Sequence, residues 1–208
     1  MYADEAIHNS IATSLAENGW CIYDNFLPTT ITETLSEELL EYVQKGKLRQ
    51  AGIGRGQRRC IDPEQRSDWI KWLEFDNATP TQLVYLEAMN RLRLSLNRSL
   101  QLSIVDYECH LALYPAGGFY KKHSDQFKDQ KTCLLTSILY LNQIWFSDFG
   151  GQLRLYTDPY NDNQYAEILP IAGRMVTFLS ARFAHAVQPC NQNRLSITGF
   201  FKTSMPIV

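Results

Sequence analysis

The spacing of hydrophobic residues predicts that the first part of the chain is mostly helical. Residues 4–18 predict a short helix that ends at an Asn-Gly pair, and residues 20–26 predict a strand. A second helix begins after Pro28 and ends at Gly46, and a third spans residues 79–98 with a Thr-Pro pair at its start. In the second helix, hydrophobic residues recur at every fourth position, as in a helix with one buried face: Ile31, Leu35, Leu39 and Val43.

From residue 104 onward the pattern changes to short β-rich runs separated by turn signals. Eight such runs predict an antiparallel sandwich or jelly-roll barrel. The fold class is therefore α+β, with helices in residues 1–100 bracing a core barrel in residues 104–202. A length of 208 residues suits a single domain, 1–208. The predicted strands are 105–114, 119–123, 132–142, 151–157, 165–169, 174–180, 184–189 and 194–202.

Composition and charge narrow the class of protein. Hydrophobic residues make up 45% and charged residues 20%, as in ordinary globular proteins, and the net charge of −2 excludes a protein that coats nucleic acid over its whole surface. The five cysteines form no Cys-x-x-Cys pair, which argues against a disulfide framework and a cysteine-rich zinc site. The first residues lack an apolar signal segment, and no apolar run reaches the ~18 residues of a membrane span. We therefore expect a cytoplasmic protein that does not enter a membrane.

The segment 45–59 stands apart because it carries six positive charges, four glycines and no acid. Two interpretations stay open: a solvated loop, or a mobile loop that meets an acidic or extended partner. Farther along, residues 66–75 contain Trp69 and Trp72, which need a packing or binding reason if they lie in a loop. The charged residues of the segment are Lys45, Lys47, Arg49, Arg55, Arg58 and Arg59.

Three short pieces of sequence together suggest a metal centre. His123-Ser124-Asp125 is a weak signal alone, and so is His185 in its strand-like run. Two histidines and one carboxylate on one face, however, make the facial triad of non-haem Fe(II) oxygenases, which leaves coordination positions open. Arg194, nine residues after the second histidine, suits a bidentate grip on a carboxylate. 2-Oxoglutarate chelates a metal at one end and carries a carboxylate at the other, so it fits both features.

These pieces lie in stretches that resemble a known family. The chain is similar to the 2-oxoglutarate/Fe(II) dioxygenases of the prolyl 4-hydroxylase type, and most similar to the hypoxia-sensing prolyl hydroxylases and their bacterial relatives. The resemblance covers about residues 20–202 and implies a double-stranded β-helix (jelly-roll) fold. The order is His-x-Asp, then 59 residues, then His, then eight residues, then Arg. The matching stretches are ALYPAGGFYKKHSD, TSILYLN, GGQLRLY, RFAHAVQP and NRLSITGFF.

The resemblance implies roles for the residues of the site. His123, Asp125 and His185 would be the iron ligands and the catalytic centre. Arg194 would pair with the distal carboxylate of 2-oxoglutarate. Tyr140 matches the family tyrosine that hydrogen-bonds the same carboxylate. Tyr114 matches a tyrosine that lines the cosubstrate pocket, with core packing as an equally open interpretation.

The resemblance also implies a peptide site, which Arg66, Asp68 and Trp72 would line. Ser67 stands where the animal enzymes have glycine, and Phe200 stands where they have a tryptophan beside the target proline. The segment 45–59 falls where the family has a mobile loop that folds over the bound substrate. His110 has no ligand role in the family, and we expect it to pack in the core or the barrel wall.

The implied activity is hydroxylation of a prolyl residue at C4 in an exposed loop of a protein substrate. Fe(II) would be the cofactor, and 2-oxoglutarate and O2 would be consumed. Succinate and CO2 would be released, and ascorbate would serve as a reductant. One alternative is demethylation of nucleic acid, because of the basic segment and the tryptophans, and another is hydroxylation of a free amino acid. A zinc hydrolase would leave Arg194 and Tyr140 unexplained. A binding module without catalysis is disfavoured because every member of the triad is present.

Overall fold

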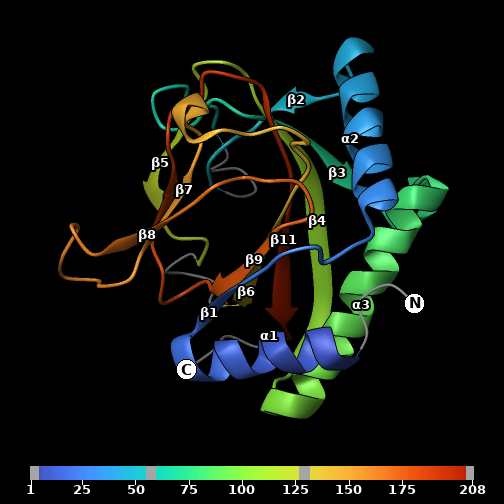
Figure 1. The fold of residues 1–208 in the computed structure, drawn as a ribbon, viewed down its shortest axis with the longest axis vertical. Coiled ribbons are helices and arrows are strands. Elements are labelled where there is room, and N and C mark those ends of the chain that lie inside the picture. Colours follow the sequence, from blue (N-terminus) through green and yellow to red (C-terminus); the bar gives the residue numbers. More distant parts are fainter. Residues whose placement is uncertain (1–4, 55–59, 127–131, 205–208) are drawn as a thin grey trace.

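The helices and strands follow the predicted order along the chain, except that two unpredicted strands, at residues 49–50 and 69–73, lie between the second and third helices (Figure 1). The computed structural model describes residues 5–54, 60–126 and 132–204. In these ranges no helix is long and apolar enough to cross a membrane. The helices are α1 (Glu5–Asn18), α2 (Thr29–Gln44) and α3 (Pro80–Leu100), with short 3-10 turns η2 (Phe75–Asn77) and η3 (Ser147–Phe149). The strands are β1 (Trp20–Tyr23), β2 (Arg49–Gln50), β3 (Trp69–Leu73), β4 (Ile104–Tyr114), β5 (Tyr120–His123), β6 (Cys133–Tyr140), β7 (Leu153–Tyr156), β8 (Tyr165–Ile168), β9 (Met175–Leu179), β10 (His185–Val187) and β11 (Arg194–Thr203).

The strands form two antiparallel sheets, which confirms the α+β jelly-roll prediction. The larger sheet has seven strands in the order β1-β9-β6-β11-β4-β3-β2, and the smaller has four in the order β5-β10-β7-β8. Hydrophobic side chains of β6, β7, β8 and β9 share one buried cluster, so the two sheets pack face to face. Among the described residues the sheets do not close into one hydrogen-bonded barrel, and an isolated bridge links Arg66, in the segment before β3, to Tyr120 of β5.

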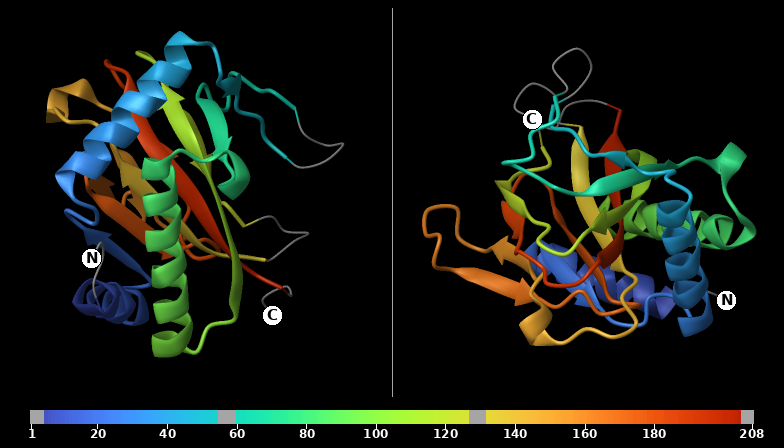
Figure 2. Two further views of the ribbon diagram at one scale, coloured as in Figure 1. Left: turned by 90° about the vertical axis from the view of Figure 1, so that its right-hand side faces the viewer. Right: turned by 90° about the horizontal axis from the view of Figure 1, so that it is seen from above.

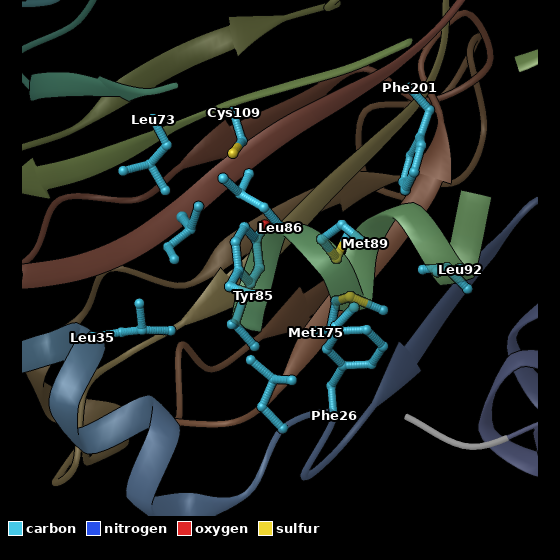
Figure 3. Close-up of a cluster of buried hydrophobic side chains, with 14 of the residues drawn as sticks. Phe26, Leu35, Leu73, Tyr85, Leu86, Met89, Leu92, Cys109, Met175 and Phe201 are labelled. Carbon is cyan, nitrogen blue, oxygen red and sulfur yellow. The ribbon is translucent and has the colours of Figure 1, made fainter. Parts of the chain in front are cut away.

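The helices cover the outer face of the seven-stranded sheet (Figure 2). Their apolar faces form the main core with that sheet, and Leu35 of α2 and Met89 of α3 lie among its labelled side chains (Figure 3). Successive residues of a strand point to opposite faces. In β4, Cys109 therefore packs toward the helices, whereas Ala112 joins a cluster on the side of the smaller sheet.

A capping box fixes where α3 begins. The hydroxyl of Thr79 accepts a hydrogen bond from the backbone N–H of Gln82 at 3.1 Å, and the Gln82 side chain accepts one from the N–H of Thr79 at 3.3 Å. Glu38 of α2 accepts hydrogen bonds from both side chains, at 2.8 and 2.7 Å. One carboxylate therefore ties the start of α3 to α2.

Two predicted segments differ from the structure. The strand expected over 20–26 ends at Tyr23, because Asn25 takes a left-handed conformation with φ of 56° that breaks the extended chain. The segment 45–59, predicted as a loop, contains β2, in which Arg49 pairs with Ile70 of β3. Its other positive charges at positions 55, 58 and 59 lie outside the described residues.

Candidate metal centre and cosubstrate pocket

Neighbouring strands of the smaller sheet bring the two histidines together. β5 and β10 pair antiparallel with His123 directly opposite His185, and Asp125 follows β5 by two residues. Nε2 of His185 lies 3.4 Å from one oxygen of Asp125, and Nε2 of His123 lies 3.7 Å from the other. The ligand atoms of the three residues all lie within 4.8 Å of one another. A single metal ion can therefore reach all three.

Backbone carbonyls orient both imidazole rings. Nδ1 of His123 lies 2.8 Å from the carbonyl oxygen of Lys121, and Nδ1 of His185 lies 3.4 Å from that of Phe183. A carbonyl can only accept a hydrogen bond, so Nδ1 carries the proton in each ring. This tautomer leaves the lone pair of Nε2 available for a metal, as in histidine ligands generally.

A hydroxyl group holds the carboxylate of the triad. Thr136 of β6 donates a hydrogen bond to Oδ2 of Asp125 at 2.7 Å. The same hydroxyl lies 2.9 Å from that of Ser180, which in turn lies 3.2 Å from the sulfur of Cys133. The carboxylate is thereby fixed to the seven-stranded sheet, although His123 and His185 belong to the smaller one.

Burial and charge keep the triad in a form that binds cations. Burial, together with the neighbouring His185, lowers the pKa of His123 to about 3, although Asp125 opposes the shift. Burial alone would raise the pKa of Asp125, but His185, His123 and the hydrogen bond from Thr136 lower it below its usual value. At neutral pH the site therefore holds a neutral His123 beside a carboxylate.

Arg194 lies behind the triad at the start of β11, and its side chain is buried with 1% exposure. Its Nε donates a hydrogen bond to the carbonyl of Gly151 at 2.8 Å, and its guanidinium lies 5.1 Å and 5.0 Å from the ring centres of Tyr114 and Tyr140. Gly151 has a φ of +68°, and a Cβ there would lie 3.0 Å from the side chain of Cys190. Glycine at this position therefore lets the backbone approach the arginine.

The buried polar atoms next to the triad fit 2-oxoglutarate. Nη2 of Arg194 and the hydroxyl of Tyr140 are buried, and neither has a hydrogen-bond partner among the described residues. An unpaired buried guanidinium is costly, so this pair suits a carboxylate supplied by a ligand. A small inner cavity of about 50 Å³ is lined by Arg194 and Tyr114 together with the triad. The triad fits Fe(II) at one end, and Arg194 fits the distal carboxylate at the other.

A larger cavity of about 870 Å³ opens outward from the triad. Arg66, Trp72 and Phe200 line it, as does His123. Asp68 does not line it: its carboxylate is buried with 1% exposure and accepts hydrogen bonds from Arg66 at 2.7 and 2.6 Å. The structure therefore places Asp68 as the residue that holds the Arg66 guanidinium, with the other three on the wall.

The wall of this cavity is joined to the metal ligands. The guanidinium of Arg66 lies 4.1 Å from the ring centre of Tyr120, and that ring stacks on His123 at 3.5 Å with 13° between the planes. Ser67 exchanges two hydrogen bonds with the backbone of Phe119, at 2.9 and 3.3 Å. A serine thus fills the place of the family glycine by fastening its segment to the residue before β5.

Sequence reasoning missed the residues that support the site. Thr136, Ser180 and Tyr120 carry no motif of their own, because many strands contain a threonine or a tyrosine. Thr136 does lie in the stretch TSILYLN, which pointed to β6 as a functional strand. Its contact with Asp125 depends on how two strands from different sheets pack, which spacing along the chain does not reveal.

The fold and the site together define a class of protein, and comparisons with known proteins agree with it. A family model described as the 2OG-Fe(II) oxygenase superfamily matches residues 109–202. Human prolyl hydroxylase EGLN3 is 28% identical over 92% of this chain and 81% of its own length. The crystal structure of a Pseudomonas putida prolyl-4-hydroxylase superposes with a TM-score of 0.83 at 35% identity, covering 94% of this chain and 98% of that one.

A second solved structure extends the comparison to an animal enzyme. The Trichoplax adhaerens prolyl hydroxylase, in complex with a peptide fragment of the hypoxia inducible factor oxygen degradation domain, has a TM-score of 0.84 at 31% identity. The match covers 95% of this chain and 90% of that chain. The protein therefore belongs to the prolyl hydroxylases, a family of 2-oxoglutarate- and Fe(II)-dependent oxygenases. It is an oxidoreductase whose family uses Fe(II), 2-oxoglutarate and O2.

Proposed function

We propose that this protein hydroxylates a prolyl residue of a protein substrate at C4. When bound, Fe(II) with 2-oxoglutarate and O2 supplies the oxidation: one oxygen atom enters the C–H bond, and the other enters succinate as CO2 is released. The observation that carries the proposal is Arg194, which is buried without a carboxylate partner among the described residues, across the inner cavity from the His-Asp-His group.

The side chains of this chain bind, orient and shield the reactants. His123, Asp125 and His185 would hold the metal ion, and the inner cavity that they line would receive the cosubstrate. Arg194 pairs with the distal carboxylate of 2-oxoglutarate, and the unpartnered hydroxyl of Tyr140 donates to the same group. Arg194 and Tyr140 are buried between the two sheets, which limits the access of water to that end of the inner cavity.

The outer cavity receives the substrate in this proposal. Trp72 and Phe200 supply flat apolar surface for a proline ring, and Arg66 supplies a fixed cation beside it. Asp68 acts through Arg66 by holding its orientation. The alternatives of nucleic acid, a free amino acid and zinc hydrolysis are not favoured, because the relatives over nearly the whole chain are prolyl hydroxylases. Ascorbate as a reductant and a cytoplasmic location stay predictions.

The test uses isotopic oxygen to find the product. Purified protein is incubated with Fe(II), 2-oxoglutarate, ¹⁸O2 and a protein extract of the cells that make it, and tryptic peptides are examined for hydroxyproline carrying ¹⁸O. Labelled hydroxyproline together with succinate is the expected result. Arg194→Met is expected to abolish both, whereas Arg194→Lys keeps a charge and retains part of the activity. Succinate without labelled hydroxyproline on any protein would contradict the substrate assignment.

A further inference from the structure

His110 is the residue of β4 that faces the site without an assigned role. Its Cα pairs with that of Trp72 on β3 and with that of Thr198 on β11, so it lies in the middle of the wall that these strands form. The ring of Trp72 meets it edge-on at 5.0 Å, and the ring of Phe200 lies 6.0 Å away. Strand alternation places it on the same face as Tyr114, which lines the inner cavity.

The position of His110 joins the two cavities. It lines both the outer cavity of about 870 Å³ and the inner cavity of about 50 Å³, and so do His123 and Asp125. His110 therefore lies where the two cavities meet, on the same lining as two of the three metal-binding residues. The expected packing in the barrel wall is correct as a location, but the ring also faces the space where the reaction would occur.

His110 is a polar group whose burial nothing in the described residues explains. It is 5% exposed, and its Nδ1 is buried without a hydrogen-bond partner in the described ranges. A leucine would fill the same space without the cost of burying an unpaired polar atom. His110 is not one of the three residues that could bind the metal. Among the described residues, its Nδ1 also forms no hydrogen bond with Arg194. A polar partner that arrives with the substrate would account for it.

The protonation state of His110 limits what that partner can be. Burial lowers its pKa to about 4; Asp68 and Asp125 oppose the shift, whereas Arg66 and Arg49 add to it. At neutral pH the imidazole is uncharged, with one nitrogen that donates and one that accepts. A charged substrate group is therefore a poor partner, and a neutral peptide group is a good one.

The chemistry of proline then selects the peptide group. A prolyl residue has no backbone N–H, so the polar groups closest to its ring are the carbonyl oxygens on either side. We propose that His110 is a specificity-determining residue that donates a hydrogen bond to the backbone carbonyl of the target proline. This inference rests on the proposed function. His110 would add a polar contact with the peptide backbone beside the apolar surface of Trp72 and Phe200.

The first test separates peptide binding from cosubstrate binding. The probes are short synthetic peptides that have one central proline and varied flanking residues. The peptide that the wild-type protein hydroxylates best is then used to compare the variants. For His110→Leu we expect the KM for this peptide to rise about 10-fold. The backbone carbonyl of the bound peptide would then lose its contact with water without gaining a hydrogen-bond donor from the protein. The KM for the cosubstrate in turnover without peptide is expected to change by a much smaller factor, because the proposed contacts of 2-oxoglutarate are Arg194, Tyr140 and the metal, and His110 is not among them. His110→Gln, which keeps a donor, is expected to recover most of the loss.

The second test identifies the atom that His110 contacts. An ester in place of the amide after the proline weakens the carbonyl of the proline as an acceptor and leaves the side chains the same. The ester is expected to raise KM for the wild-type protein and to have little effect on His110→Leu. Equal effects on both, or equal peptide KM values for the wild type and His110→Leu, would overturn the inference. If the wild type turns over none of the peptides, the proposed function itself fails, and the inference fails with it.

Discussion

At the scale of single residues, the metal centre depends on a side chain outside the ligand set. Asp125 is anchored by Thr136, and that hydroxyl is fixed in turn by Ser180. Groups that orient a metal ligand commonly change metal affinity when they are removed, because the ligand must then be ordered by the metal itself. The triad is therefore part of a hydrogen-bonded chain that reaches into the larger sheet.

Thr136→Val keeps the shape of the side chain and removes the hydroxyl. We expect the affinity for Mn²⁺ to fall by a factor of ~10–100, since Oδ2 of Asp125 loses its donor. Isothermal titration without 2-oxoglutarate measures this directly. Thr136→Ser keeps the hydroxyl and serves as the matched control, with an affinity close to that of the wild type. Equal affinities for Thr136→Val and Thr136→Ser would show that the hydrogen bond does not position Asp125.

His110 gives a second prediction at this scale, on stability in acid. Its folded pKa of about 4 lies below the ordinary histidine value of 6.5, so between these values the unfolded chain binds a proton that the folded protein does not. Stability is therefore lost as the pH falls through this window. From pH 7 to pH 5 the wild-type protein without metal is expected to lose ~2 kcal/mol more than His110→Leu. Urea unfolding at both pH values measures the difference, and parallel losses would show that His110 is protonated in the folded protein.

At the scale of elements, β11 is the strand on which both the site and the core depend. Its start provides Arg194, its middle faces the cavity, and it pairs with β4 on one side and β6 on the other. Gly199 permits this arrangement: a Cβ there would lie 2.0 Å from the hydroxyl of Tyr107. That hydroxyl lies 2.6 Å from the hydroxyl of Tyr85 and 3.1 Å from that of Ser137. Tyr107 therefore has little freedom to move away.

Gly199→Ala should destabilise the protein strongly. The added methyl group would overlap the ring of Tyr107, whose Cζ would lie 2.4 Å from it. We expect a loss of ~3 kcal/mol in the free energy of unfolding, at the upper end for overpacking. Gly46→Ala is the control, because no heavy atom lies within 4 Å of a Cβ there and only its φ of +60° is unfavourable. That variant is expected to lose ~1 kcal/mol. Similar losses in urea denaturation would contradict the close approach at Gly199.

Elements also show what the sequence could and could not predict. The three helices and most strands follow from hydrophobic spacing and from Gly, Asn and Pro at their ends, as at Gly19, where φ is +80°. β2 and β3 were missed: β2 has two residues, too few to show alternation, and the WIKWL run of β3 does not alternate between apolar and polar residues. His123, Asp125, His185 and Arg194 could be proposed from their order and the family resemblance. The residues that support them could not be proposed from the sequence, because Thr136 meets Asp125 only through the packing of one sheet on the other.

At the scale of the whole molecule, the site lies between two sheets that are joined mainly by side chains. β5 and β10 supply the histidines, the larger sheet supplies Thr136 and Arg194, and Asp125 stands between them. A metal and a cosubstrate that bind these residues together bridge the two sheets. Ligands that bind only the folded protein raise its stability in proportion to the logarithm of their concentration.

Thermal unfolding should therefore report the two ligands separately. A metal at 100 times its Kd stabilises the fold by ~2.7 kcal/mol. For a chain of this length that corresponds to a rise in Tm of ~5–10 °C. Adding 2-oxoglutarate to the Mn²⁺-loaded protein is expected to raise the Tm again. Arg194→Met should keep the increment from Mn²⁺ and lose the increment from 2-oxoglutarate. A variant that keeps both increments would show that Arg194 does not hold the cosubstrate.

The attachment of Ser67 to the residue before β5 has a thermodynamic consequence for the whole cycle. The carbonyl of Gln65 also accepts a hydrogen bond from the backbone N–H of Lys121 at 2.9 Å, so the segment that lines the outer cavity and the strand that ends in His123 are held together. Binding energies that act on one ordered unit are linked, and the linkage is reciprocal. A peptide that orders residues 65–68 should tighten metal binding by some factor, and the metal should then tighten peptide binding by the same factor. The enzyme would thus hold its metal most firmly when a substrate is present to be oxidised.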